Sequence, residues 1–197
     1  MIIVTGGAGF IGSNLVSRLN RSGRDDIIIV DDLSDSRKIK NISDLNFCDY
    51  IDYLDFLNVI ENRDYFSKID AVFHQGACSD TTVTDAKYVM KVNFDYSKKM
   101  LKWAFNQESQ FIYASSASVY GMGKNGFVES RECESALSPY AFSKFLFDQY
   151  VRTKLSIQNS QIVGLRYFNV YGPREHHKGA MVSTVFQLIK QLKDNGK

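Results

Sequence analysis

The sequence has little of what marks secreted, metal-binding or membrane-embedded proteins. Its three cysteines, Cys48, Cys78 and Cys133, are widely spaced and form no C-x-x-C pair, so neither a disulfide framework nor a metal site is expected. It contains no run of about 18 apolar residues, and no basic segment with a cleavage site follows Met1. We therefore expect a cytoplasmic protein with free thiols and no membrane contact.

An excess of charge of one sign is also lacking. Lys and Arg number 24 against 22 Asp and Glu, which gives a formal net charge of +2. No long basic run is present that could follow a phosphate backbone, so nucleic acid is not expected as a partner. With 197 residues, 44% of them hydrophobic, the chain is long enough for one well-packed domain.

The chain does contain short apolar segments that alternate with longer helical patterns. Strands are predicted at 2–5, 27–30, 71–74, 111–114 and 162–167, and helices at 10–22, 85–106, 139–155 and 181–193. The stretch 47–67 is interpreted as a short strand followed by a helix. This alternation is typical of βαβ units, so the predicted fold class is α/β, with a Rossmann-like, doubly wound parallel sheet.

A glycine-rich turn lies between the first strand and the first helix. Its sequence is TGGAGFIG over 5–12, with Gly6, Gly9 and Gly12 at the spacing of a dinucleotide-binding turn. Such a turn needs backbone angles that side chains forbid, and it brings the backbone close to a pyrophosphate at a helix N-terminus. The position of the motif between strand and helix therefore predicts dinucleotide binding.

Acidic residues follow the second predicted strand. Asp31 and Asp32 stand where a carboxylate can accept hydrogen bonds from the adenosine ribose, which favours NAD. Arg37 and Lys38 come a few residues later and could bind a 2′-phosphate, or they could belong to a solvated loop. From these residues alone, NAD and NADP both remain open.

A candidate reactive centre lies in the second half of the chain. Tyr140 and Lys144 are four residues apart in a predicted helix and so reach the same face. A nearby ammonium favours the phenolate, which would let the pair exchange a proton with a hydroxyl near neutral pH. Upstream, the run YASSASVYG over 113–121 ends a strand, and Ser116, with Ser118 as the alternative, is predicted to hydrogen-bond the substrate oxygen. A Tyr-x-x-x-Lys match alone also occurs in ordinary amphipathic helices.

Taken together, these motifs and the run RYFNVYGPR over 166–174 resemble the extended short-chain dehydrogenase/reductases, the NAD-dependent epimerase/dehydratase family. The resemblance spans the entire chain. Within that family, the runs GACS (76–79), SKFLFD (143–148) and REHHKG (174–179) are similar to the ADP-heptose 6-epimerases.

The resemblance implies an isomerase that inverts C6″ of ADP-D-glycero-D-manno-heptose by transient oxidation with bound NADP, for the inner core of lipopolysaccharide. Tyr140 and Lys178 would handle protons on opposite sides of the sugar. Ser116 would assist, and Lys144 would position the cofactor and Tyr140. From the residues alone, Lys178 could equally be an exposed loop cation beside two histidines that form no metal site.

By resemblance and from the glycine turn, the expected cofactor contacts are Gly6, Gly9, Phe10, Ile11, Gly12, Asp31, Asp32, Lys38, Gln75, Gly76, Ala77, Cys78, Ser79, Asn93, Lys144, Val170 and Lys178. The expected substrate contacts are Ser116, Asn169, Ala180 and Gln187. Three residues depart from the family pattern. Asp32 replaces a frequent asparagine, Tyr53 replaces a lysine that helps to bind the 2′-phosphate, and Gln187 replaces a histidine. The first two departures weaken the expectation of NADP, and NAD stays an alternative, whereas the third concerns the sugar pocket.

Complete members of the family are longer and have a C-terminal region that closes over the sugar nucleotide. The sequence is therefore interpreted as a nucleotide-binding domain over 1–172 and the start of a substrate-binding region over 173–197, with the remainder missing. The resemblance also implies a homo-oligomer, with a pentamer as one form.

Two other interpretations stay open. A UDP-hexose 4-epimerase uses the same serine, tyrosine and lysine, and Lys178 is the feature that would distinguish the two enzymes. A sugar-nucleotide 4,6-dehydratase is disfavoured, because it needs an Asp-Glu pair where this chain has Ala117 and Ser118.

The second open interpretation is a nucleotide-binding protein without catalysis.

Overall fold

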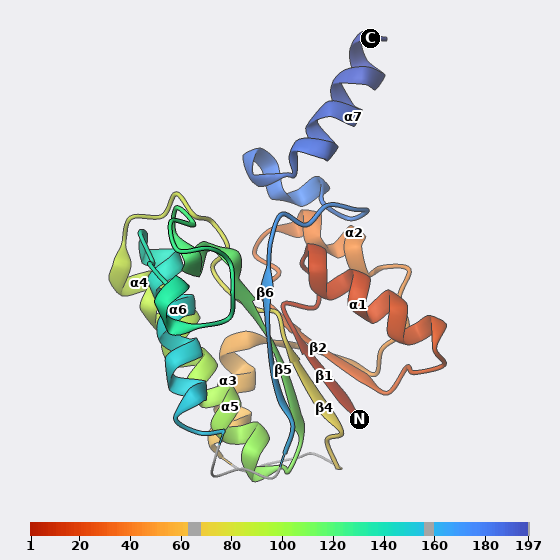
Figure 1. The fold of residues 1–197 in the computed structure, drawn as a ribbon. Coiled ribbons are helices and arrows are strands. Elements are labelled where there is room, and N and C mark those ends of the chain that lie inside the picture. The colour runs from red at the N-terminus through yellow and green to blue at the C-terminus, as the bar shows by residue number, and fades with distance from the viewer. Residues whose placement is uncertain (63–67, 156–159, 197) are drawn as a thin grey trace.

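The computed structural model describes residues 1–62, 68–155 and 160–196, which form a sheet flanked by helices (Figure 1). Six parallel strands lie in the order β3-β2-β1-β4-β5-β6. The strands are β1 (Ile2–Thr5), β2 (Ile27–Asp31), β3 (Asp49–Asp52), β4 (Ala71–His74), β5 (Gln110–Ser116) and β6 (Ile162–Tyr167). This order confirms the predicted Rossmann-like, doubly wound sheet.

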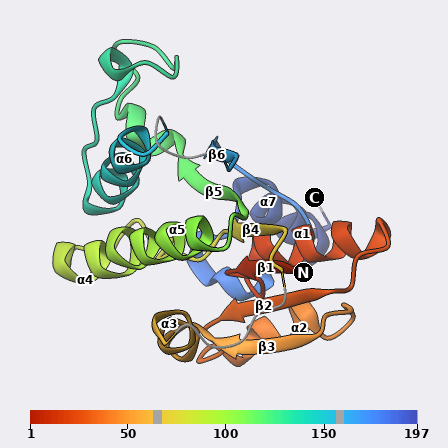
Figure 2. The same cartoon turned by 90° about the horizontal axis from the view of Figure 1, so that it is seen from below.

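Helices cover both faces of the sheet (Figure 2). One face packs against α1 (Phe10–Arg21) and α2 (Ile39–Ile42), and the other against α3 (Tyr53–Glu61), α5 (Tyr96–Asn106) and α6 (Pro139–Arg152). The remaining helices are α4 (Ala86–Met90), α7 (Thr184–Asn195) and the short η1 (Ser36–Lys38), η2 (Lys91–Asp95), η3 (Ala117–Tyr120), η4 (Arg131–Cys133) and η5 (His176–Met181).

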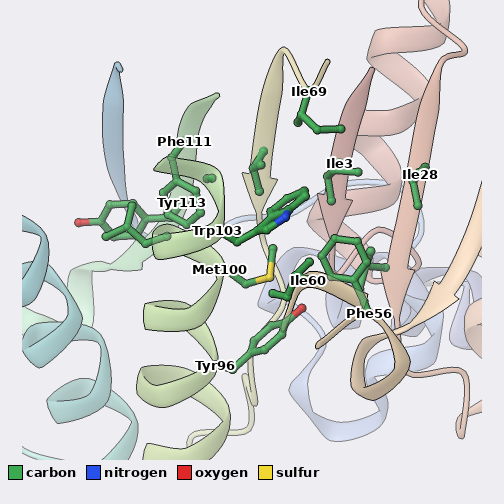
Figure 3. Packing of buried hydrophobic residues seen from close by; sticks show 14 of the residues in the cluster. Ile3, Ile28, Phe56, Ile60, Ile69, Tyr96, Met100, Trp103, Phe111 and Tyr113 are labelled. Carbon is green, nitrogen blue, oxygen red and sulfur yellow. The ribbon is translucent and has the colours of Figure 1, made fainter. Parts of the chain in front are cut away.

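The main core lies between the sheet and α3, α5 and α6 (Figure 3). There Ile3 and Phe111 from the sheet meet Phe56, Met100 and Trp103 from the helices. A second cluster on the opposite face joins the sheet to α1 and α2. The central strands β1, β2 and β4 are buried on both faces because both faces are covered, and this is why they appear in the sequence as largely apolar runs.

The predicted strands are confirmed, with β2 and β5 slightly longer than expected. The strand and helix expected within 47–67 are β3 and α3, and the part over 63–67 lies outside the described residues. The single helix predicted at 85–106 is wrong in detail, because the π-helical turn η2 separates α4 from α5. The helix predicted at 181–193 begins only at Thr184, since Ser183 caps it and Val182 is extended.

Candidate functional site

The site begins at the glycine turn after β1. Gly6 has φ +67°, and a Cβ atom there would lie 2.7 Å from the Gly76 nitrogen. A Cβ atom on Gly12 would lie 2.1 Å from the Gly6 oxygen. Gly9 caps α1 without a side-chain hydrogen bond, and the first turn carries no acidic residue. Free backbone N–H groups therefore face this turn, and the arrangement fits a pyrophosphate.

Asp31 stands at the carboxyl end of β2 and is almost buried. Its Oδ2 accepts a hydrogen bond from the Ala8 nitrogen at 2.8 Å. Its Oδ1 accepts from the Asp32 nitrogen at 2.7 Å and from Lys38 Nζ at 3.0 Å. The carboxylate thus ties the glycine turn to the loop after β2, and the Lys38 ammonium balances its charge.

Two adjoining pockets open at this edge of the sheet, and both include Gly6, Asp31, Lys38, Gly76 and Ala77. The first has tyrosine and valine walls that suit a purine and its ribose, and it is lined further by Val30, Asp32, Tyr53, Cys78, Tyr88, Val92 and Tyr96. The second lies over the glycine turn and is lined further by Gly9, Phe10, Ile11, Gly12, Gln75, Ser79, His177 and Lys178. Most of the predicted cofactor contacts are therefore brought together.

A buried hydrogen-bond chain fixes the end of β4. The Gly76 nitrogen donates to Thr5 Oγ1 at 3.1 Å, and Thr5 Oγ1 lies 2.7 Å from His74 Nδ1. His74 Nε2 lies 2.8 Å from Ser97 Oγ, which itself donates to the Asn93 carbonyl at 2.6 Å. Since Ser97 donates onward, it accepts from His74 Nε2, and Nδ1 accepts from Thr5. Burial lowers the pKa of His74 to about 3, which keeps the ring neutral.

Asn93, in the π-helical turn η2, clamps the loop after β4 to α6. Its Oδ1 accepts from the Cys78 nitrogen at 2.8 Å, and its Nδ2 lies 3.1 Å from both the Cys78 oxygen and Ser143 Oγ. Ser143 Oγ in turn donates to the Tyr140 carbonyl at 2.7 Å. Asn93 is fully buried, so the observed role is to position the loop, and its direct contact with a cofactor stays a prediction. Burial raises the pKa of the Cys78 thiol, which disfavours a reactive thiolate.

The structure brings Ser116, Tyr140 and Lys144 together where β5 ends beside α6. Lys144 is almost buried, its Nζ donates to the Ala114 carbonyl at 2.9 Å, and it lies 5.9 Å from the centre of the Tyr140 ring. Burial lowers the pKa of Lys144 to about 8, although Asp148 opposes this shift. Ser116 accepts from the Ser118 hydroxyl at 2.8 Å, so both candidate serines belong to one cluster.

The expected lowering of the tyrosine pKa is not found. Burial raises the pKa of Tyr140, and a hydrogen bond with Ser116 only opposes that rise. The physical reason is that the Lys144 ammonium is directed to a backbone carbonyl and does not contact the phenol oxygen. The pKa of Tyr140 would fall if another group drew the Lys144 ammonium toward the phenol oxygen.

Lys178 lies on η5, away from Tyr140 in sequence, and lines the second pocket. Its Nζ stands 5.4 Å above the Phe10 ring, at the glycine turn. The other residues expected on the sugar side, Asn169, Val170, Ala180 and Gln187, are all exposed. Their predicted contacts with cofactor or substrate stay predictions.

Sequence reasoning missed the residues that hold the 172–183 segment in place. Glu175 is fully buried and accepts from the Gly172 and Ser183 nitrogens at 2.8 and 2.6 Å. Arg174 Nη2 pairs with Asp44 at 2.7 Å, and Asn41 Nδ2 lies 3.0 Å from His177 Nδ1. The contacts of Arg174 and His177 join residues at least 130 positions apart, and no local pattern in the sequence signals them.

In the described ranges 1–62, 68–155 and 160–196, no group of three or more metal-ligating side chains lies together. Across the same ranges, no helix combines the length and the apolar character needed to cross a bilayer.

Solved structures of sugar-nucleotide epimerases share this architecture. The ADP-L-glycero-D-manno-heptose-6-epimerase of Helicobacter pylori is 35% identical, with a TM-score of 0.84 over 98% of this chain and 62% of that chain. The UDP-glucuronic acid 4-epimerase of Bacillus cereus, solved with NAD, is 30% identical, with a TM-score of 0.79 over 98% and 63%. The UDP-N-acetylglucosamine 4-epimerase of Methanobrevibacter ruminantium is 28% identical, with a TM-score of 0.83 over 98% and 62%.

The chain thus spans less than two thirds of the length of these relatives. At the level of sequence families, residues 2–197 match the NAD dependent epimerase/dehydratase family. Together with the glycine turn, the sheet order and the Ser116–Tyr140–Lys144 cluster, this match establishes that the chain belongs to the NAD dependent epimerase/dehydratase family.

Proposed function

We propose that this chain carries the nucleotide-binding and catalytic part, over 1–172, of a cytoplasmic ADP-D-glycero-D-manno-heptose 6-epimerase that works with bound NADP and supplies lipopolysaccharide synthesis. Residues 173–197 would begin the substrate-binding region, and the working enzyme would be a homo-oligomer. The observation that carries the proposal is the Ser116–Tyr140–Lys144 cluster at the end of β5 and the start of α6, and Lys178 in the lining of the second pocket adds to it. Similarity to the Helicobacter pylori heptose epimerase supports the choice of sugar.

The residues of the cluster have complementary tasks in such an inversion. The glycine turn and Lys144 would hold NADP, which would supply reversible hydride transfer at the sugar carbon. Tyr140 would take the proton of the sugar hydroxyl at its phenol oxygen, and Ser116 would donate a hydrogen bond to the forming carbonyl oxygen. Lys144 would favour the phenolate once its ammonium is drawn from Ala114 toward the ribose and Tyr140.

Lys178 would serve the second face of the sugar. In the heptose inversion as proposed, the substrate oxygen would face opposite sides of the pocket before and after the intermediate turns, so a second proton-handling group would serve the second position. Lys178 is half-buried and lies over Phe10, at the turn on which the pyrophosphate would rest. Its ammonium would donate the proton that the substrate oxygen needs when the hydride returns to the carbon.

A UDP-hexose 4-epimerase is the second candidate. The relatives from Bacillus cereus and Methanobrevibacter ruminantium are 4-epimerases of UDP-sugars, and the Ser116, Tyr140 and Lys144 cluster suits that chemistry equally. The first candidate gives a catalytic task to Lys178, and the second does not.

The deciding experiment follows the sugar protons by NMR. The purified chain is incubated with NADP and ADP-D-glycero-D-manno-heptose, and in parallel with NAD and UDP-glucose. Appearance of the L-glycero isomer supports the proposal, and appearance of UDP-galactose supports the second candidate. If neither product appears while nucleotide binds, the chain is a nucleotide-binding protein without turnover.

Matched variants test the assigned roles. Tyr140→Phe and Lys178→Met should each lower the rate of heptose inversion at least about a hundredfold, as expected for the loss of an acid–base group. Lys190→Met removes an exposed lysine of α7 and should leave the rate unchanged. If Lys178→Met inverts the heptose at the original rate, Lys178 has no part in proton transfer.

A further inference from the structure

His177 lies in the wall of the second pocket and is anchored to the glycine turn through one amide side chain. Asn41 is fully buried on α2, and its Nδ2 donates to the Ala8 carbonyl at 2.9 Å. The same nitrogen lies 3.0 Å from His177 Nδ1. The ring is therefore fixed against the turn that the pyrophosphate would occupy.

This anchoring determines which ring nitrogen carries the proton. A carbonyl only accepts hydrogen bonds, so the Asn41 atom that faces Ala8 is the amide nitrogen, which donates its second hydrogen to His177. Nδ1 of His177 is then an acceptor, and in the neutral ring the proton resides on Nε2. Burial lowers the pKa of His177, with further contributions from Lys38 and His176 that outweigh the opposing effects of a hydrogen bond to the Arg174 backbone and of Asp35. His177 thus presents a neutral N–H donor.

The position of the ring along η5 places it at the ribose end of the pocket. The preceding residue, His176, lies 3.3 Å from the Arg37 carbonyl, in the segment after β2. The following residue, Lys178, lies over Phe10 at the glycine turn. His177 stands between them and shares the pocket lining with Lys38 and Asp31. Because Lys38 balances the charge of Asp31, this corner of the pocket does not repel an anion as a free carboxylate would.

We propose that His177 Nε2 and Lys38 Nζ together bind a phosphate monoester on the 2′-oxygen of the adenosine ribose, so that this pair selects NADP over NAD. The proposal rests on the proposed function, which names NADP as the cofactor. It gives the loop that carries Lys178 a second task in nucleotide recognition. It also explains how NADP can be accepted by a chain with Asp31 at the end of β2 and Tyr53 at a position where a lysine would assist.

The test measures the dissociation constants of NADP and NAD by isothermal titration calorimetry on nucleotide-free protein. His177→Asn keeps an acceptor for Asn41 near the Nδ1 position but removes the Nε2 donor. It should weaken NADP binding about tenfold or more, since hydrogen bonds to charged groups are strong, and should change NAD binding less than about twofold. His177→Gln places an amide N–H near the Nε2 position and should restore most of the NADP affinity. His176→Asn is the matched control and should alter neither constant.

The outcomes separate this inference from the cofactor assignment on which it rests. If the original chain prefers NADP and His177→Asn keeps that preference, the assignment of His177 is overturned while NADP stands. Equal weakening of NADP and NAD also overturns it, because the ring would then contact a group common to both. If the original chain prefers NAD, both the NADP assignment and the His177 pair are overturned.

Discussion

The nucleotide side and the sugar side of this site are built in different ways. On the nucleotide side, Asp31 and Asn93 are buried, and hydrogen bonds to neighbouring loops fix their orientation. On the sugar side, the expected contacts Asn169, Ala180 and Gln187 are exposed, and so are large apolar residues such as Phe168 (59%) and Tyr171 (65%). The sheet, helices α1–α6 and η5 thus position the nucleotide side. Nucleotide binding should therefore be separable from turnover, and each prediction below tests this contrast.

The largest effect is expected at a buried ionic cluster that joins β6, from which the sugar side extends, to α6. Arg166, 9% exposed, pairs with Glu134 and with Asp148, whose carboxylate also accepts from Tyr113 and Ser115. Arg166→Met leaves the buried Asp148 carboxylate without its paired cation, whereas Glu134 keeps its pair with Arg152, so the free energy of unfolding should fall by about 3–5 kcal/mol.

Urea denaturation measures this change, and Arg24→Met is the matched control. Arg24 pairs with Asp26 and Asp70 at the surface, where solvent screens the charges, so the control should unfold at nearly the original urea concentration. Equal effects of the two substitutions would mean that the cluster at Arg166 does not hold β6 to α6.

A methyl group in the glycine turn should have the next largest effect and should act on the nucleotide side alone. The Cβ atom of Gly12→Ala would lie 2.1 Å from the Gly6 oxygen, a backbone atom that cannot move aside cheaply. We expect a loss of about 1–3 kcal/mol in unfolding free energy and loss of measurable dinucleotide binding. In Gly9→Ala the new Cβ atom would lie 3.2 Å from the Gly6 oxygen, so a smaller loss of unfolding free energy and of dinucleotide binding is expected. If calorimetry finds full binding by Gly12→Ala, the turn does not approach the pyrophosphate closely.

The third effect concerns Lys144, whose burial costs stability. Its pKa falls from an ordinary 10.5 to about 8 in the folded state. Between these values the unfolded chain binds more protons than the folded chain, so the folded state gains stability as the pH rises. Relative to Lys144→Met, the original chain should gain about 2 kcal/mol between pH 7.5 and 9.5.

Urea denaturation at both pH values checks this difference, and comparison with the variant removes the contributions of other groups. If the unfolding free energies of the two proteins changed with pH in the same way, burial would not lower the pKa of Lys144. Saturating cofactor should reduce the effect, because a bound ribose would give the ammonium a new partner.

Much of the fold and of the nucleotide side could be predicted from the sequence. The predicted central strands are largely apolar runs because helices cover both faces of the sheet, and such runs are local signals. Gly6 and Gly12 could be predicted because the surrounding backbone leaves no room for a side chain, so these positions require glycine. Tyr140 and Lys144 were identified by helical spacing.

The features that were missed depend on contacts between distant segments. The π-helical turn at Asn93 interrupts a helix whose apolar periodicity looks continuous, since the reason for the turn is the Cys78 loop that the asparagine clamps. Likewise, the pairing of Asn41 with His177 joins segments that nothing in either local pattern connects. The raised pKa of Tyr140 was missed because burial dominates it and the Lys144 ammonium is directed to the Ala114 carbonyl, and both are properties of the folded chain.

The smallest effect is expected on α7, which extends away from the sheet in Figure 1. Its face with Val185, Leu188, Ile189 and Leu192 is 39–56% exposed, so Leu188→Ala should change the unfolding free energy by less than about 0.5 kcal/mol. Leu101→Ala, on α5 in the main core, should cost about 2–5 kcal/mol. Both are measured by urea denaturation at two protein concentrations. If Leu188→Ala costs as much as Leu101→Ala, and the cost grows with protein concentration, copies of the chain cover α7 in solution. The sugar side would then lie at a contact between copies of the chain, whereas the nucleotide side would still be formed within one chain.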